Sequence, residues 1–201
     1  MFTQAGRNQL LDATTITHVS LHTAYPGESG TSEVSGGSPA YARQSVTWAA
    51  SSSGNKVSNN AQAFDVPAAV SVNWLGFWTA LTSGTFLATS PNGANPKRYA
   101  LSLASANTIG AVNHGYTANQ PVVFYSDTPP SGLTAGTTYY VVGATVTTDT
   151  FQVSAAPSGA AIALTGQPGN AAVVSSIVTE SFGAQGTFTV NAGSATLNLN
   201  Y

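Results

Sequence analysis

The chain has 201 residues, enough for one large β domain or two small ones, and only 6% of them are charged. An average soluble domain carries roughly 25% charged residues, and the five Lys and Arg of this chain are too few to form the basic face that binds nucleic-acid phosphates. Cysteine is absent, which excludes disulfides, thiolate metal ligands and Cys nucleophiles. No apolar run approaches the roughly 18 residues of a membrane span, and the first residues lack the pattern of a secretion signal, so we expect neither.

A single short helix is expected at the N-terminus, where residues 7–12 avoid β-branched side chains and Thr3 is placed as an N-cap. After it, hydrophobic alternation with a period of two predicts strands. In the first hundred residues we expect them at 16–23, 43–49, 56–58, 62–66, 70–78 and 86–89. Trp74 and Trp78 share one face of the last-but-one strand, and apolar residues occupy its other face. We therefore expect this strand to be covered on both sides and to form the centre of the core.

The composition changes near residue 100. Only two charged residues occur between residues 99 and 178, and turn signals there separate further strand-like runs. These runs lie at 121–125, 138–142, 150–154 and 160–164. Alternation returns at 182–190 and 195–200, which indicates strands that complete a sheet begun by the first hundred residues. We therefore predict an all-β fold, in which a jelly-roll-like β-sandwich (residues 1–100 plus 176–201) receives a second small β module (residues 101–175) as an insertion.

The three histidines do not predict a metal site. His18 and His22 lie four residues apart on a predicted strand, which separates their side chains by about 13 Å, too far for one ion. Partly buried, hydrogen-bonded imidazoles are the expected alternative. His114 precedes a glycine and is expected in a turn. We accordingly predict neither a metal nor a cofactor.

The few acidic residues offer little material for catalysis. Glu28 and Glu33 share a Gly-rich loop, whereas a glycosidase pair must be held about 5–10 Å apart with one pKa raised. Such a loop favours two solvated carboxylates, and Asp65 and Glu180 have no evident partner. The sequence contains no nucleophile elbow, phosphate-binding loop or zinc-protease motif. We expect no enzymatic activity; a glycan-cleaving enzyme is the alternative that converging carboxylates would favour.

Arg43 is the most informative charged residue of the sequence. It follows Tyr41 and a Gly/Ser-rich loop, and it is placed to stack on an aromatic ring or to pair with Glu28 or Glu33. The alternative is an anchor between subunits, because Arg and Tyr are enriched at interface hot spots. Both interpretations stay open at this point.

Tyrosines on predicted loops and strand ends are further candidates, because aromatic faces stack on sugar rings. The alternative, which we favour, is that they are edge or core aromatics of a sandwich. Together with the charged residues above, the candidate interface or recognition residues are Tyr25, Glu28, Glu33, Tyr41, Arg43, Tyr116 and Tyr125.

Several segments resemble a family of small virion structural proteins of tailed bacteriophages. They are LHTAYPGESG at 21–30, EVSGG at 33–37, YARQSVTW at 41–48, LGFW at 75–78 with GTFL at 84–87, and FGAQGT at 182–187. A second set resembles a β module that recurs in phage tail and tail-fibre proteins: HG at 114–115, VVF at 122–124, GLTAGTTYYVV at 132–142 and DTFQV at 149–153. The resemblance implies a virion component without catalytic residues, either a minor tail or tail-fibre-like protein or a capsid decoration protein.

The charge-poor composition and the resemblance together predict how such a protein acts. We expect the outer sandwich to attach to other virion proteins, the inserted module to project, and the chain to form a closed homo-oligomer, either a trimer or a ring. The expected location is the virion, after assembly in the host cytoplasm, with no binding to nucleic acid and no membrane insertion. A host-surface carbohydrate- or receptor-binding module is the alternative function.

Overall fold

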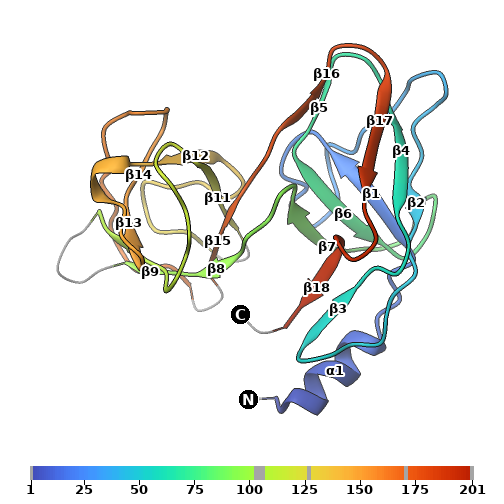
Figure 1. Cartoon of the computed structure of the whole chain (residues 1–201), viewed down its shortest axis with the longest axis horizontal. Helices are drawn as coiled ribbons and strands as arrows, with labels where there is room; N and C mark the ends of the chain where they lie inside the picture. Colours follow the sequence, from blue (N-terminus) through green and yellow to red (C-terminus); the bar gives the residue numbers. More distant parts are fainter. Residues whose placement is uncertain (1, 102–106, 126–127, 170–171, 200–201) are drawn as a thin grey trace. The chain divides into compact units, whose positions relative to one another are not determined.

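The computed structural model describes residues 2–101, 107–125, 128–169 and 172–199. The chain divides into two compact units, unit 1 (residues 1–90 with 179–200) and unit 2 (residues 91–178) (Figure 1). Unit 2 extends beyond the module expected at residues 101–175, because Lys97–Arg98 pairs with Val173–Ser176 inside it. The structure is mostly β with several sheets and one short N-terminal α-helix in the described residues, which confirms the predicted class.

Unit 1 combines the helix with strands from both ends of the chain. Its elements are α1 (Gln4–Asp12), β1 (His18–His22), β2 (Gln44–Ser45), β3 (Asn55–Val57), β4 (Gln62–Val66), β5 (Val70–Val72), β6 (Trp74–Trp78), β7 (Phe86–Pro91), β16 (Glu180–Phe182), β17 (Gly186–Val190) and β18 (Thr196–Asn198).

The N-terminal helix is fixed at both of its ends. Thr3 is the N-cap, and its side chain accepts a hydrogen bond of 3.2 Å from the backbone N–H of Gly6, as the sequence predicts. At the other end, Lys56 of β3 donates to Asp12 at 2.7 Å. This hydrogen bond, together with two from Ser51, lowers the pKa of the Asp12 carboxyl to about 2. The ion pair thereby joins α1 to β3, which lies beside it in Figure 1.

Two layers enclose the core of unit 1. One layer is an antiparallel sheet in the order β2-β1-β6-β7, and the other consists of the pairs β4-β17, β5-β16 and β3-β18. The tail strands therefore pair with strands at residues 55–72. The core residues between the layers include Val19, Leu21, Phe64, Val66, Leu75, Phe77, Phe188 and Val190. Every residue of β6 is buried, so its central position in this core is confirmed.

Several predicted strands of unit 1 are shorter or interrupted in the structure. The run expected at 182–190 divides into β16 and β17, with a bend at residues 183–185 between them. The strand expected at 70–78 breaks at Asn73, because β5 pairs with the tail strand β16 whereas β6 pairs with β1. The strand expected at 43–49 is reduced to β2. Beyond it, the side chain of Asn60 accepts the hydrogen bond of the Thr47 backbone N–H at 2.8 Å and so replaces a strand partner.

Unit 2 is formed by one continuous stretch of chain. Its elements are β8 (Lys97–Arg98), β9 (Ala100–Leu101), β10 (Ile109–Gly110), β11 (Pro121–Tyr125), β12 (Thr138–Val141), the 3-10 helix η1 (Gly143–Thr145), β13 (Thr150–Phe151), β14 (Val153–Ser154) and β15 (Val173–Ser176). The sheet β14-β12-β11-β15-β8 and the sheet β13-β10-β9 contribute to a second core. Its largest fully buried side chains are those of Phe124, Phe151, Ile109 and Leu164.

Two strand predictions for unit 2 need correction. The strand expected at 150–154 is divided at Gln152, because β13 pairs with β10 while β14 pairs with β12. The strand expected at 160–164 is wrong: this segment forms no strand, although Leu164 is buried. Three of its five residues are alanines, which are poor strand formers. No helix in the described ranges has the length and apolar character needed to cross a membrane.

Candidate functional site

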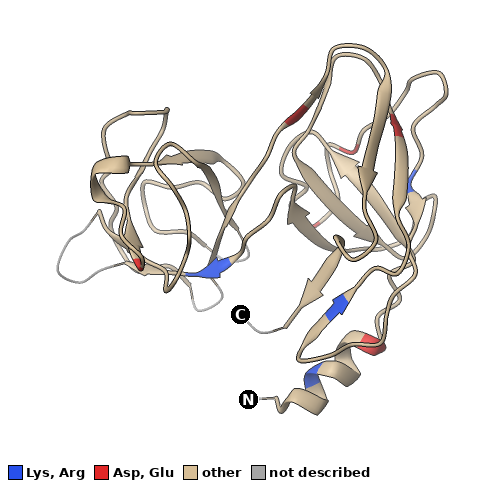
Figure 2. Cartoon of the chain, in the orientation of Figure 1, with Lys and Arg blue, Asp and Glu red and all other residues tan. Residues whose placement is uncertain are grey.

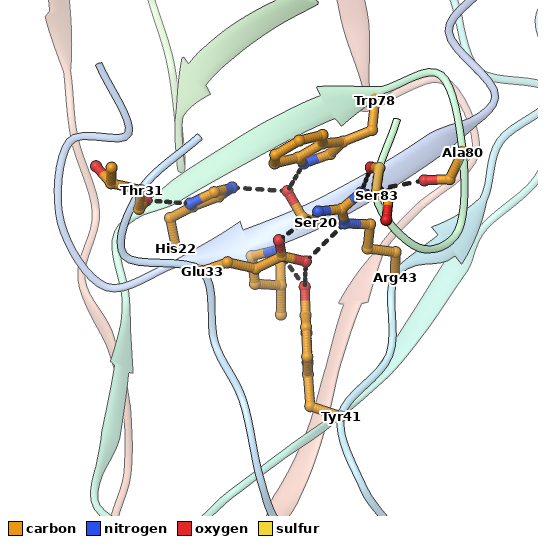
Figure 3. Close-up of polar contacts among 10 residues, drawn as sticks. Ser20, His22, Thr31, Glu33, Tyr41, Arg43, Trp78, Ala80 and Ser83 are labelled. Carbon is orange, nitrogen blue, oxygen red and sulfur yellow. Dashed lines mark hydrogen bonds and ion pairs between the residues drawn. The ribbon is translucent and has the colours of Figure 1, made fainter. Parts of the chain in front are cut away.

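Polar side chains converge over one face of the sheet in unit 1. His18, Ser20 and His22 alternate with the core residues of β1 and therefore point away from the core. Ser20 lies opposite Gly76 of β6, and a Cβ at Gly76 would collide with both Ser20 Oγ and His22 Nε2. The glycine thus creates the space in which a serine and a histidine meet above the sheet (Figure 3).

A chain of hydrogen bonds runs through this space. The indole N–H of Trp78 donates to Ser20 Oγ at 2.8 Å, and Ser20 Oγ lies 2.7 Å from His22 Nε2. His22 Nδ1 lies 2.7 Å from the backbone oxygen of Thr31. A carbonyl only accepts, so His22 carries its proton on Nδ1, and Ser20 donates to Nε2. With a neutral imidazole, each group in this series of hydrogen bonds has a partner. Burial also lowers the pKa of His22, which favours the neutral form.

Ser20 and His22 have the spacing of a catalytic nucleophile and its general base, but a substrate has no access to them. The exposed fraction of both residues is 0%, so a substrate cannot reach Ser20 Oγ in this structure. The group that orients the imidazole is a backbone carbonyl rather than a carboxylate. These residues hold the loop at residues 24–33 against β1.

Arg43 is bound on several sides by its own chain. Its Nε and Nη2 each donate to one carboxylate oxygen of Glu33 at 2.8 Å, a bidentate ion pair. Its Nη1 donates to the backbone oxygens of Ala80 at 3.1 Å and Ser83 at 2.8 Å. The guanidinium carbon lies 3.5 Å from the ring centroid of Trp78, a cation–π contact. One side chain therefore joins the loop before β2 to the turn between β6 and β7 (Figure 3).

Tyr41 supports the same ion pair from below. Its hydroxyl accepts the backbone N–H of Leu21 at 2.8 Å and donates to Glu33 Oε1 at 3.5 Å. Its ring stacks on that of Phe64 within the core, with the ring centroids 6.1 Å apart. Burial raises the pKa of the Tyr41 hydroxyl far above its ordinary value, so this group stays protonated.

A pocket of about 480 Å³ opens beside these residues. Its walls come from three loop segments of unit 1, and its lining residues are Glu33, Val34, Ser35, Gly36, Tyr41, Ala42, Arg43, Leu81, Thr82 and Ser83. Apolar surface dominates the lining, and the single carboxylate and single guanidinium cancel in charge. The pocket has the size of a small-ligand site, for which roughly 300–1,000 Å³ is typical.

The structure brings together three of the predicted candidates and separates the others. Glu33, Tyr41 and Arg43 form one cluster, and Arg43 makes both intrachain contacts that the sequence suggested, a carboxylate pair and an aromatic stack. Tyr25 is half-buried and packs on Trp74, with ring centroids 5.0 Å apart. Glu28 is exposed and does not line the pocket. Whether any of these residues contacts another subunit stays a prediction.

The two tyrosine candidates of unit 2 belong to its β framework. Tyr116 is buried, and its hydroxyl lies 2.7 Å from the backbone oxygen of Asn95 and 3.0 Å from that of Val174. Tyr125 is half-buried at the end of β11. The positions of both fit edge or core aromatics better than a platform for a sugar ring.

The remaining titratable residues within the described ranges do not assemble a second site. Glu28, Asp65 and Glu180 are exposed, and of the four acids considered for a glycosidase pair only Glu33 lines the pocket. His114 follows a turn but is buried, and its Nδ1 accepts the backbone N–H of Tyr116 at 2.9 Å. Across the ranges that the structure describes, no group of three or more His, Cys, Asp or Glu is placed to hold a metal ion.

Sequence reasoning missed the partners that complete the cluster. These partners are Ser20 of β1, Trp78 of β6 and the carbonyls of Ala80 and Ser83 in the β6–β7 turn, all far from Arg43 in the sequence. One local signal was available, because Gly76 interrupts an otherwise bulky strand between Trp74 and Trp78. A glycine within a central strand often marks the close approach of another group.

The comparisons with known proteins match part of the chain to a family model. The N-terminal part of the chain is similar to a family of phage tail-fibre-like virion proteins. Its residues 2–100 match the family described as podophage GP4 fiber I protein gp80. This match confirms the resemblance to tailed-phage virion proteins that the motifs between residues 21 and 87 suggested, and it supports a structural virion component. The motifs at 114–153 and 182–187 lie outside the matched residues, so their resemblance stays a prediction. No curated protein and no solved structure matches the chain.

Proposed function

We propose that the chain is a non-enzymatic structural component of a tailed-phage particle, a minor tail or tail-fibre-like protein that acts through protein–protein contacts in a symmetric assembly. The observation that carries this proposal is the match of residues 2–100 to a podophage fibre family. The matched segment includes the whole N-terminal part of unit 1, up to residue 90. We therefore assign attachment to the particle to unit 1, and a projecting role to unit 2.

The surface chemistry supports assembly through neutral contacts. Charged side chains are sparse along both units (Figure 2). Hydroxyl and amide groups cost less to desolvate than Lys or Glu, so a surface rich in Ser, Thr and Asn is suited to burial between subunits. Apolar residues such as Leu81, Leu87 and Val112 are also exposed in the single chain. A closed homo-oligomer, a trimer or a ring, is the assembly that we propose.

Electron microscopy of intact particles tests the proposal directly. We expect density for this chain at the tail, in several copies related by the symmetry of the tail. Density on the head would identify a capsid decoration protein instead, and its absence from the particle would contradict a structural role. The neutral surface also predicts that assembly is nearly indifferent to salt between about 50 and 500 mM. Sedimentation velocity across that range checks this, and dissociation by salt would contradict it.

A further inference from the structure

The pocket beside Arg43 offers a set of polar groups that the fold itself does not use. Within the described residues, the hydroxyls of Ser35, Thr82 and Ser83 have no hydrogen-bond partner, and all three line the pocket. The guanidinium of Arg43 has five N–H donors, of which four are engaged, so one Nη2–H remains. The side chain of Arg43 is 10% exposed and that of Glu33 is 22% exposed, so both keep an accessible edge.

We infer that this pocket binds a neutral saccharide unit. A sugar ring presents several hydroxyls, which both donate and accept, and an apolar face of C–H groups. The pocket matches the first feature with three free hydroxyls, a carboxylate and one N–H, and the second with the exposed Leu81 and the mainly apolar lining. Its volume of about 480 Å³ is sufficient for a ligand of this size.

The charges of the pocket favour a neutral ligand over an ionic one. Glu33 and Arg43 are the only charged lining residues, and each already neutralises the other at 2.8 Å. An anion would compete with Glu33 for the guanidinium, and a cation would compete with Arg43 for the carboxylate. Either ligand would disrupt a partly buried ion pair, which is costly because it leaves one charge unpaired.

The origin of the walls argues against an extended peptide as the ligand. The lining residues lie at 33–36, 41–43 and 81–83, before β2 begins at Gln44 and between β6 and β7. A peptide that adds to a sheet needs an open strand edge with repeating N–H and C=O groups. These loop segments offer side-chain hydroxyls instead, which suit a compact polyhydroxylated ring.

The inference is tested by ligand-observed NMR and calorimetry on the full chain, independently of its place in the virion. Three pyranose sugars of the glucose configuration serve as probes: N-acetylglucosamine is neutral, glucuronate is anionic and glucosamine is cationic when its amine is protonated. Methyl glycosides of glucose, galactose and mannose extend the neutral set. We expect at least one neutral sugar to bind with a Kd on the order of 1 mM, and about tenfold more tightly than the charged rings.

Variants with matched controls locate the binding. Ala42 is exposed and lines the pocket, whereas Ala63 is exposed on β4 and does not. Ala42→Trp should fill the pocket and weaken binding at least about tenfold, and Ala63→Trp should leave it unchanged. If the Trp introduced at residue 42 perturbs folding, Leu81→Ala compared with Leu87→Ala provides a second pair of variants. Leu81 is 51% exposed and Leu87 is 46% exposed, but only Leu81 lines the pocket.

Each of the following results would overturn the inference. The first is that no neutral sugar binds below about 50 mM. The second is tighter binding of a charged ring, or binding that persists unchanged in both Ala42→Trp and Leu81→Ala. The third is a particle map in which a side chain of a neighbouring subunit fills the pocket, which would identify a protein contact instead.

Discussion

Unit 1 and unit 2 are both antiparallel β structures, but they are held together in different ways. Unit 1 closes through strands of the C-terminal tail, and one of its side-chain contacts joins residues 110 positions apart, Ser71 and Ser181. It also contains both ion pairs found among the described residues. Unit 2 consists of one continuous stretch and has an aromatic core around Phe124 and Phe151. The comparison teaches that unit 1 depends on the return of the C-terminal tail and on polar ties, whereas unit 2 is closed within one stretch of chain and has a mainly apolar core.

Removing residues 179–201 should have the largest effect and should affect the two units differently. The truncation deletes the partners of β3, β4 and β5 and exposes Phe64 and Val66 to solvent. We expect unit 1 to unfold completely and unit 2 to stay folded. All three Trp lie in unit 1, so Trp emission should shift to the red while amide resonances of unit 2 remain dispersed in NMR spectra. Loss of both units together would show that unit 2 is not independent.

A single methyl group at Gly76 should strongly destabilise unit 1. The new Cβ would collide with Ser20 and His22, which are both fully buried. We expect Gly76→Ala to lower the free energy of unfolding by about 3 kcal/mol, as in other overpacked cores. Urea unfolding followed by Trp fluorescence measures this change.

Gly110 of unit 2 provides the matched control for Gly76. A Cβ at Gly110 meets nothing closer than the backbone oxygen of Ala100, at 3.7 Å, an ordinary contact. Gly110→Ala should therefore change the stability of unit 2 by less than about 1 kcal/mol. Equal effects at the two positions would contradict the view that Gly76 is required for the space above β1.

The same contrast explains how much of the molecule the sequence predicts. The strands at 62–66 and 121–125 have the expected bounds, because their hydrophobic pattern is local and each is paired along its whole length. The break at Asn73 was not predictable, because it depends on which distant strand each neighbour pairs with. Local pattern determines the element, and tertiary pairing determines where it is interrupted.

The candidate site was predictable only in part, for a related reason. Because the chain has few acidic residues, the sequence offered only Glu28 and Glu33 as nearby ion-pair partners for Arg43. In the structure, Glu33 is the partner. The carbonyls of Ala80 and Ser83 carry no sequence signal, because every residue has a carbonyl. Their orientation toward Arg43 follows from the β6–β7 turn, which only the folded chain defines.

Removing the charge of Arg43 should destabilise unit 1 by an intermediate amount. Arg43→Met keeps an apolar stem near Trp78 but leaves the Glu33 carboxylate and two backbone carbonyls without their donor. Breaking a fully buried pair costs about 3–5 kcal/mol; because both side chains are partly exposed here, we expect about 2 kcal/mol. Urea unfolding followed by Trp fluorescence provides the measurement.

A double variant separates the ion pair from the other contacts of Arg43. Glu33→Gln combined with Arg43→Met should lose less stability than the two single changes added together, because neither charge is left unpaired. Strict additivity would mean that Arg43 acts mainly through Trp78 and the carbonyls.

In unit 2, Asp149→Ala removes an exposed hydrogen bond of 2.8 Å to the Asn113 N–H and should cost about 1 kcal/mol or less.

The smallest effect should appear as a dependence of the stability of unit 1 on pH. Burial lowers the pKa of His22 below its ordinary value of 6.5, so as the pH falls through 6.5 the unfolded chain takes up a proton that the folded chain does not. The free energy of unfolding is therefore highest above that pH and decreases as the pH falls toward the folded-state pKa of His22. His18, whose pKa is also lowered by burial, contributes in the same direction.

Two variants assign this slope to its source. His22→Gln should remove most of the change in stability between about pH 7.5 and 5.5, and His18→Asn should remove a smaller part, because His18 is less buried than His22. Urea midpoints from Trp fluorescence at each pH provide the measurement, and only their pH dependence is compared, since His22→Gln also disturbs the bonds to Ser20 and Thr31. A wild-type chain with constant stability over this range would mean that His22 gains a proton without leaving its place. Its Nε2–H would then donate to Ser20 Oγ, so the Ser20 hydroxyl would have to turn its own proton away from the ring.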